Sequence, residues 1–242
     1  MLILILLFTA TWSIYIYFVV KDKRLFGFYF KGFTSFLFIL TFGYGFYKHF
    51  LLNNPLSIPA NDVAQIANSE LKFAILIFVG LVAGLIGDLF LEMMHSDKTK
   101  DKHTIIAFGT IVFLIGHLFY IAGLTIIGSF SYISIIIGLV MTIIVYIGSK
   151  VLKLKMGKLE ILIIIYTLVI FIMIGQAIMN AFYLEFNTFS VVFMIGAILF
   201  GISDLLLAPI YFGDKETNPI VVANLSTYYF GQLLIALAIY FL

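Results

Sequence analysis

Acidic residues occur inside two long apolar stretches of this chain. The segment GLIGDLFLEM carries Asp88 and Glu92 four residues apart, and the segment FGISDLLL carries Asp204. A carboxylate placed in hydrocarbon is costly when ionised, so each of these residues is a candidate functional residue. Two carboxyl groups in one low-dielectric pocket do not both ionise, because desolvation and mutual repulsion oppose the second charge. Asp88 and Asp204 therefore predict an acid and a base at neutral pH, the pair that hydrolysis through an oxocarbenium-like cation requires.

The elements that position these acids must span a membrane. Of the 242 residues, 63% are hydrophobic and 11% are charged, whereas a soluble domain has about 25% charged residues. Eight apolar runs are long enough to cross about 30 Å of hydrocarbon: Leu2–Val20, Gly32–Leu52, Phe73–Met94, Thr104–Leu124, Phe130–Gly148, Ile161–Tyr183, Thr188–Phe212 and Ile220–Leu242. Such runs form helices and not barrel strands, because they lack polar alternation. We predict an all-α integral membrane protein, a single domain formed by a bundle of eight transmembrane helices.

Basic residues are concentrated on one side of this predicted bundle. Twelve Lys or Arg residues lie in or beside the odd-numbered connections, and the other side has two, Lys48 and Lys72. The twelve are Lys21, Lys23, Arg24, Lys31, Lys98, Lys100, Lys102, Lys150, Lys153, Lys155, Lys158 and Lys215. Because basic loops stay in the cytoplasm, we expect these connections to be cytoplasmic and both termini to lie outside the cell membrane. Residues 53–72 are then expected to form an outer loop with one short helical turn.

The two aspartates are expected at a similar depth in the membrane. Their helices, the third and the seventh, both cross from outside to the cytoplasm, and each Asp lies roughly 10–13 Å from the cytoplasmic helix end. A parallel four-plus-four repeat would explain this match. Small residues surround both acids, at Gly80, Gly84, Ala197, Gly201 and Ala208. Because helices approach closely at small residues, we expect both acids to face the bundle interior.

Other polar residues form stripes at helical spacing. They are Asn224, Tyr228 and Gln232 in the last run, Tyr166, Met173, Gln176 and Asn180 in the sixth, and His117 and Tyr120 in the fourth. Each one alone is typical of a hydrogen bond between helices, but together they predict a polar seam from the acids toward the outer half. Glu92 either reaches interfacial water or belongs to the site. Lys31 either extends to the headgroups or holds a phosphate.

Several kinds of chemistry are excluded by composition. The chain has no cysteine, so thiol catalysis and Cys-based metal sites are absent. Its four histidines show no ligand spacing, and the sequence contains no nucleophile elbow, zinc motif or phosphate-binding loop. We therefore expect no metal and no cofactor. The net charge of +2 is too small to indicate a nucleic-acid partner.

Five segments, in this order, resemble the lysoplasmalogenase family of multi-span membrane proteins, also called YhhN-like. They are GLIGDLFLEM, FGTIVFLIGHLFYIAGL, YTLVIFIM, GAILFGISDLLLA and TYYFGQLLIAL. The segment YFKGFTSF matches the early Lys-containing segment of the family more loosely. The resemblance extends from about residue 25 to the C-terminus. The chain departs from the family at Gly32, where relatives often have Pro, and at Gly231, where Ala is common; neither position is expected to contact the acids.

The resemblance implies an eight-helix enzyme that cleaves the vinyl ether bond of a lysoplasmalogen. The products would be a fatty aldehyde and a glycerophospho-alcohol, with no known cofactor, and the partners would be this lysophospholipid and membrane lipids. By this resemblance Asp88 and Asp204 are the catalytic carboxylates. The residues expected around the substrate, from the resemblance and the stripes together, are Lys31, Glu92, His117, Tyr120, Tyr166, Gln176, Asn224, Tyr228 and Gln232. The oligomeric state stays open.

Three other functions use similar residues. A proton-coupled transporter or lipid-handling protein also places acids at matched positions in the membrane. An intramembrane aspartyl protease uses two aspartates, but here Ser203 precedes Asp204, and Leu85 occupies the position of the first glycine in that family's Gly-x-Gly-Asp motif. A non-catalytic packing or sensor protein of the same fold is the third, because a fold does not determine a function.

Overall fold

The computed structural model describes residues 1–52, 60–93, 101–213 and 217–242, with the backbone alone for residues 24–25 and 60–67. Within these ranges the chain forms eight long α-helices and no strand. The helices are α1 (Leu2–Val20), α2 (Arg24–Tyr47), α3 (Ala60–Met93), α4 (Lys102–Ile127), α5 (Tyr132–Val151), α6 (Glu160–Tyr183), α7 (Thr188–Phe212) and α8 (Asn218–Ala238). A π-helical turn, Lys48–Leu52, continues α2, and 3₁₀ turns lie at Gly157–Leu159 and Ile239–Phe241.

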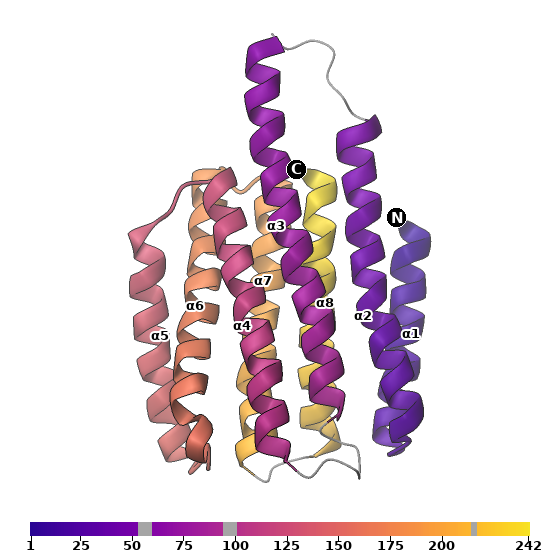
Figure 1. Ribbon diagram of the computed structural model, residues 1–242, viewed down its shortest axis with the longest axis vertical. Helices are drawn as coiled ribbons and strands as arrows, with labels where there is room; N and C mark the ends of the chain where they lie inside the picture. The colour runs from indigo at the N-terminus through magenta and orange to yellow at the C-terminus, as the bar shows by residue number, and fades with distance from the viewer. Residues whose placement is uncertain (53–59, 94–100, 214–216) are drawn as a thin grey trace.

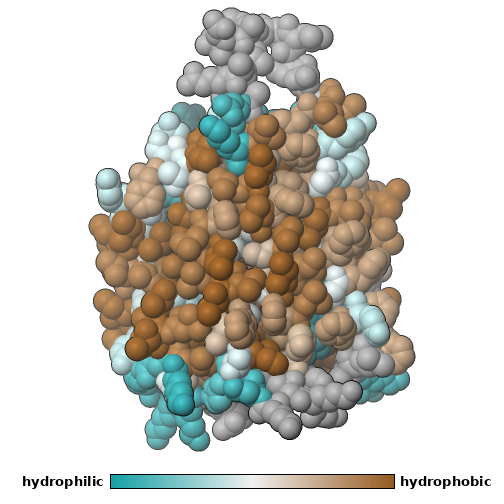
Figure 2. All heavy atoms as spheres, viewed as in Figure 1, coloured by the Kyte–Doolittle hydropathy of each residue, from teal (hydrophilic) through white to brown (hydrophobic). Residues whose placement is uncertain are grey.

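Each of the eight helices is long and apolar enough to cross a membrane. They form one bundle, with α5 and α6 at one edge and α1 and α2 at the other (Figure 1). Apolar residues form a belt around the face shown in Figure 2, and hydrophilic residues gather at its two ends. The prediction of an all-helical membrane protein with eight spans is confirmed. Figure 1 also places both chain termini at the same end of the bundle, here called the terminal end; the opposite end, which carries the turn of residues 21–23 and the connection of residues 152–159, is called the basic end.

Helices α2 and α3 begin two or more turns before their apolar runs. Helix α2 begins at Arg24, so Lys31 lies two turns inside it and not at its start. Helix α3 begins at Ala60, and the expectation of a loop over residues 53–72 is therefore wrong for residues 60–72; residues 53–59 lie outside the described residues. The reason is physical: an apolar run marks the depth of hydrocarbon, whereas backbone hydrogen bonding continues a helix into polar surroundings.

The start of α4 is capped by a side chain. Asp101 accepts hydrogen bonds from the Thr104 backbone N–H, at 3.1 Å, and from the Thr104 hydroxyl. Such a cap satisfies a backbone donor that has no partner within the helix. These hydrogen bonds, first the one from the hydroxyl, lower the pKa of the Asp101 carboxyl group, because they favour its ionised form.

Glycines allow the central helices to pack closely. A Cβ atom on Gly116 of α4 would lie 3.2 Å from the Gly80 backbone oxygen of α3. A Cβ on Gly196 of α7 would lie 2.8 Å from the Gly231 backbone oxygen of α8. The small-residue stripe beside Asp88 therefore does bring helices together, as predicted.

The helices that carry the two aspartates run in the same direction, toward the basic end (Figure 1). Asp88 lies in the last two turns of α3, and Asp204 lies just over two turns before the end of α7. Both carboxyl groups are therefore near the basic end of the bundle. The four-plus-four repeat stays a prediction.

Candidate active site

A cavity of about 490 Å³ lies between the helices near the basic end. Its size is within the range of ligand pockets, about 300–1,000 Å³. Every helix contributes to its lining, which is mostly aliphatic and aromatic, and Asp22 and Lys23 in the turn between α1 and α2 also contribute. Of the residues predicted for the site, seven line this cavity: Lys31, Asp88, Glu92, Tyr166, Asp204, Asn224 and Tyr228.

Asp88 is buried and held by two hydroxyl groups. Its Oδ2 atom accepts a hydrogen bond of 2.6 Å from the Ser35 hydroxyl of α2 and one of 2.8 Å from the Tyr228 hydroxyl of α8. The Ser35 Oγ atom is in turn 3.3 Å from the hydroxyl of Tyr229. Three helices therefore meet at this carboxyl group, and its orientation is determined by donors from both neighbours.

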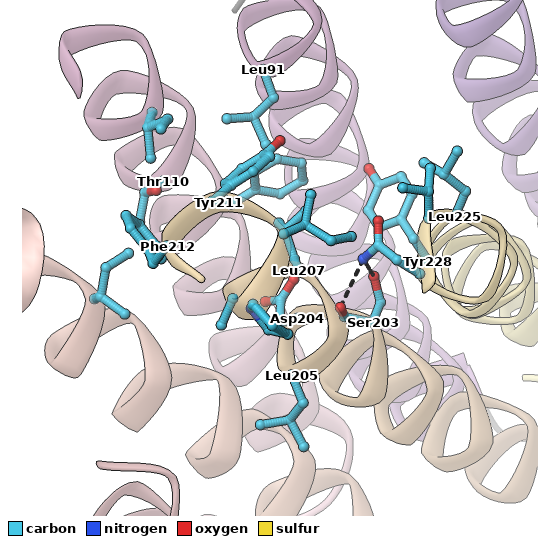
Figure 3. A pocket seen from close by; sticks show the side chains of 18 of the residues that line it. Leu91, Thr110, Ser203, Asp204, Leu205, Leu207, Tyr211, Phe212, Leu225 and Tyr228 are labelled. Carbon is cyan, nitrogen blue, oxygen red and sulfur yellow. Dashed lines mark hydrogen bonds between the residues drawn. The ribbon is translucent and has the colours of Figure 1, made fainter. Parts of the chain in front are cut away.

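Asp204 has a different environment. Its carboxyl group interacts with the Tyr166 hydroxyl of α6. Its Oδ2 atom is buried and has no hydrogen-bond partner among the described residues. Figure 3 shows Asp204 and Tyr211 from α7 together with Tyr228 from α8 in the lining of the cavity.

The turn of α7 that carries Asp204 is attached to α8 beside the cavity. The Asn224 side chain donates hydrogen bonds to the Ser203 backbone oxygen, at 2.7 Å, and to the Ser203 hydroxyl, at 2.9 Å, drawn as dashed lines in Figure 3. Asn224 therefore fixes the position of the residue next to Asp204. Its contribution to the site is to hold α7 in place.

Lys31 and Glu92 form an ion pair inside the cavity. The Lys31 Nζ atom lies 3.1 Å from the Glu92 Oε2 atom, and the two side chains are 9% and 10% exposed. The interpretations of Glu92 as a residue at interfacial water and of Lys31 as extending to the headgroups are therefore wrong. The interpretation of Lys31 followed from its place just before the apolar run that starts at Gly32, whereas α2 begins earlier and buries Lys31 between helices. The interpretation of Glu92 followed from its place one turn nearer the helix end than Asp88, and the ion pair with Lys31 contradicts it.

Three predicted residues form a separate cluster deeper in the bundle. The Tyr120 hydroxyl donates a hydrogen bond of 3.0 Å to the Gln232 Oε1 atom. The His117 ring is 2.5 Å, through Nδ1, from the Phe113 backbone oxygen and packs against the rings of Tyr120, Tyr166 and Phe200. The described lining of the cavity does not include His117, Tyr120 or Gln232.

Gln176 lies near the terminal end. Its side chain accepts a hydrogen bond from the Ser131 backbone N–H and donates to the Ser129 backbone oxygen and to Asn180. Asn180 donates to the backbone oxygen of Leu124, near the end of α4. These bonds hold the connection between α4 and α5, and the structure does not bring Gln176 to the cavity.

Two hydroxyl groups around Asp88 were not found from the sequence. Ser35 lies one turn after Lys31 on α2, and that spacing beside a membrane-buried lysine was the available signal. Tyr229 was hidden because it follows Tyr228 directly, and consecutive residues point to different sides of a helix. Within the described residues, no three His, Asp or Glu side chains come together as a possible metal site.

The fold and the cavity define a class, that of multi-pass helical membrane proteins with carboxyl groups inside the bundle. The model of the YhhN family matches residues 29–239. The chain belongs to the YhhN family, and the resemblance found in the sequence is confirmed. No curated protein and no solved structure matches the chain.

Proposed function

We propose that this protein is a membrane hydrolase that cleaves the vinyl ether bond of lysoplasmalogens by acid/base catalysis with Asp88 and Asp204. The main support is that carboxyl groups from α3 and α7, 116 positions apart in the chain, line one cavity with mostly apolar walls. Membership of the YhhN family agrees with this reaction. The products are a fatty aldehyde and a glycerophospho-alcohol.

The chemistry requires a proton donor and a water-activating base. Protonation of the vinyl carbon farther from the ether oxygen produces an oxocarbenium ion, and water adds to the carbon that carries the oxygen. The resulting hemiacetal breaks down to the aldehyde and the alcohol. One carboxylic acid and one carboxylate in an apolar cavity supply these proton transfers.

The lining of the cavity suits an amphiphilic substrate. Aliphatic side chains such as Ile144 of α5, Ile163 of α6 and Leu207 of α7 form a wall that an alkenyl chain can contact. Lys31 and the exposed Lys23 are the lining cations that a phosphate group would face. We therefore place the headgroup at the basic end and the alkenyl chain between the helices.

The orientation in the membrane follows from the basic residues. The described connections at the basic end include Lys21, Lys23, Lys153, Lys155 and Lys158, while Lys98, Lys100 and Lys215 lie outside the described residues. Because basic loops remain in the cytoplasm, the basic end faces the cytoplasm and both termini face outward. The substrate then enters from the cytoplasmic leaflet.

Aldehyde release by the purified, detergent-solubilised protein tests this proposal. A lysoplasmalogen is the substrate, and the acyl lysophospholipid with the same headgroup and chain length is the control. Aldehyde from the vinyl ether without fatty acid from the ester is the expected result. Turnover of the ester alone would show that the protein is an ester hydrolase and not an ether hydrolase. Turnover of neither lipid by folded protein would contradict the proposal.

A proton-coupled transporter is the second candidate, because polar groups continue beyond the cavity. A Cβ atom on Gly84 would lie 3.7 Å from the Tyr228 hydroxyl and 2.8 Å from Gln232 Nε2, which places both polar groups beside the same glycine. Gln232 is bonded to Tyr120 still deeper. Proton-dependent uptake by proteoliposomes, without hydrolysis of the transported lipid, would favour this candidate.

A further inference from the structure

The two carboxyl groups of the proposed site differ in the hydrogen bonds that they receive. Asp88 receives two, from Ser35 at 2.6 Å and from Tyr228 at 2.8 Å, and both end on Oδ2. Hydrogen bonds donated to a carboxylate stabilise its ionised form. The Lys31 ammonium group is also within electrostatic reach of Asp88. These contacts favour a negative charge on Asp88 and leave Oδ1 as the oxygen that can accept a proton.

Asp204 lacks equivalent support for a charge. Its carboxyl group interacts with the Tyr166 hydroxyl, its Oδ2 atom is buried without a hydrogen-bond partner, and no described cation forms an ion pair with it. A carboxylate in a mostly apolar cavity with a single hydroxyl partner is less well stabilised than one with two donors and a nearby ammonium group, so Asp204 is the acid that keeps its proton. An acid that donates its proton to a carbon atom must reach the substrate, and Asp204 is part of the lining of the cavity.

Other titratable groups near the two acids come from six helices. Those around Asp88 are Tyr15 of α1, Lys31 of α2, Glu92 of α3, Tyr166 of α6, Tyr211 of α7, and Tyr228 and Tyr229 of α8. Those around Asp204 are Tyr166 of α6 and Tyr211 of α7. Lys31 and Glu92 neutralise each other as an ion pair. The tyrosines are neutral at neutral pH, so the two aspartates are the groups whose charge states differ.

We propose that Asp204 is the proton donor of the reaction and that Asp88 is the carboxylate that activates water. This assignment rests on the proposed function and divides two roles that the sequence left interchangeable. Its basis is the contrast between a carboxyl oxygen with two donors and a buried carboxyl oxygen with none.

The proton transfers balance over one turnover. Asp204 gives its proton to the vinyl carbon farther from the oxygen, whose double-bond electrons form the new C–H bond. Asp88 takes a proton from water as the water oxygen bonds to the oxocarbenium carbon. In the breakdown of the hemiacetal, Asp88 returns its proton to the glycerol oxygen as the C–O bond breaks, and Asp204 takes the hydroxyl proton as the aldehyde forms. One water molecule is consumed, and both carboxyl groups regain their starting states.

Infrared spectroscopy tests the charge states without any turnover. The protein is studied at neutral pH in a detergent that contains no ester, because a protonated carboxyl group has a carbonyl stretch that a carboxylate lacks. We expect this band in the wild type and in Asp88→Asn, and its loss in Asp204→Asn. Glu185→Gln, which alters an exposed carboxylate at the terminal end, is the matched control and should leave the band unchanged. Loss of the band in Asp88→Asn, or its absence from the wild type, would overturn the assignment.

The dependence of kcat/KM on pH tests the roles in catalysis. The wild type should show a bell-shaped profile, which falls at low pH as the base is protonated and at high pH as the acid is ionised. Each Asp→Asn variant should be slower by about 10²–10⁴-fold. In its residual activity, Asp88→Asn should lose the fall at low pH, and Asp204→Asn should lose the fall at high pH. If an aspartate had only a structural role, its Asn variant would keep the fall in kcat/KM at both low and high pH.

The outcomes separate this assignment from the proposed function. If Asp88→Asn instead lost the fall at high pH and Asp204→Asn lost the fall at low pH, the assignment would be overturned and the hydrolase proposal would stay intact. Absence of aldehyde from folded wild-type protein would overturn the hydrolase proposal and the catalytic roles together. In that case the infrared band still decides which aspartate carries the proton.

Discussion

The basic end and the terminal end of this bundle use polar side chains in different ways. At the basic end Lys31, Asp88 and Asp204 line a cavity. At the terminal end Gln176 and Asn180 bind backbone groups of the connection between α4 and α5, and each is almost completely buried. Both regions have the composition expected of a functional site in a membrane. They differ in whether helix packing leaves space beside the polar groups.

The comparison shows how a polar residue in a membrane span can be interpreted. Asn224 and Asn180 are the same residue type on two helices, and each donates to a backbone oxygen of another helix. Asn224 does so beside Asp204, so its bond fixes a residue of the site, whereas Asn180 closes a connection. The partner of a buried amide therefore decides its role, and residue type alone does not.

The largest effect is expected from breaking the ion pair at the basic end. Lys31→Met leaves Glu92 buried without its partner, which should lower the free energy of unfolding by about 3–5 kcal/mol. The double variant Lys31→Met with Glu92→Met should recover most of that loss, since no charge then remains unpaired. Chemical unfolding in detergent measures both. A single variant as stable as the double variant would show that Glu92 does not need Lys31.

The next largest effect is expected from disrupting the close contact between α7 and α8. Gly196→Ala forces a Cβ against the Gly231 backbone oxygen at 2.8 Å and the Ile235 backbone nitrogen at 2.9 Å, neither of which can rotate away. We expect a loss of about 1–3 kcal/mol in the free energy of unfolding. Gly43→Ala is the matched control, because nothing lies within 4 Å of its Cβ position. Equal stability of the two variants would contradict this packing.

The two asparagines provide a direct test of the comparison. Asn180→Leu and Asn224→Leu each remove the hydrogen bonds that the amide group donates to a neighbouring helix, at a cost of about 0.5–1.5 kcal/mol of stability per bond. Aldehyde release should fall in Asn224→Leu, because Ser203 beside Asp204 is released, and should persist in Asn180→Leu. Activity and thermal unfolding are measured on the same preparations. Equal activity of the two variants would remove the distinction between the two ends.

The smallest effect is expected in the deeper cluster. Tyr120→Phe keeps the ring and removes the hydrogen bond of 3.0 Å to Gln232. The free energy of unfolding should fall by about 1 kcal/mol. Adding Gln232→Leu should restore part of the loss, because the unpaired amide oxygen is then removed. No loss in Tyr120→Phe would show that this bond does not stabilise the bundle.

The sequence alone was sufficient for the class of fold and for the two aspartates that line the cavity. In hydrocarbon the backbone N–H and C=O groups have no water to bind and must form hydrogen bonds with each other, so eight long apolar runs predict eight helices. The ends of the helices were harder to predict, as the starts of α2 at Arg24 and of α3 at Ala60 show, because hydropathy follows the membrane boundary and helices extend past it. Asp88 and Asp204 were found because charge in hydrocarbon is rare and costly.

The tertiary structure decided which of these polar groups meet. Ser35 reaches Asp88, Lys31 pairs with Glu92, and Gln176 is turned to a connection, although all lie in similar apolar surroundings along the chain. The rotation of each helix about its axis is set by many small packing contacts with its neighbours, such as Gly196 against Gly231. The spacing of residues along one helix does not contain those contacts, and for that physical reason the partners of each buried polar group were decided by the folded bundle.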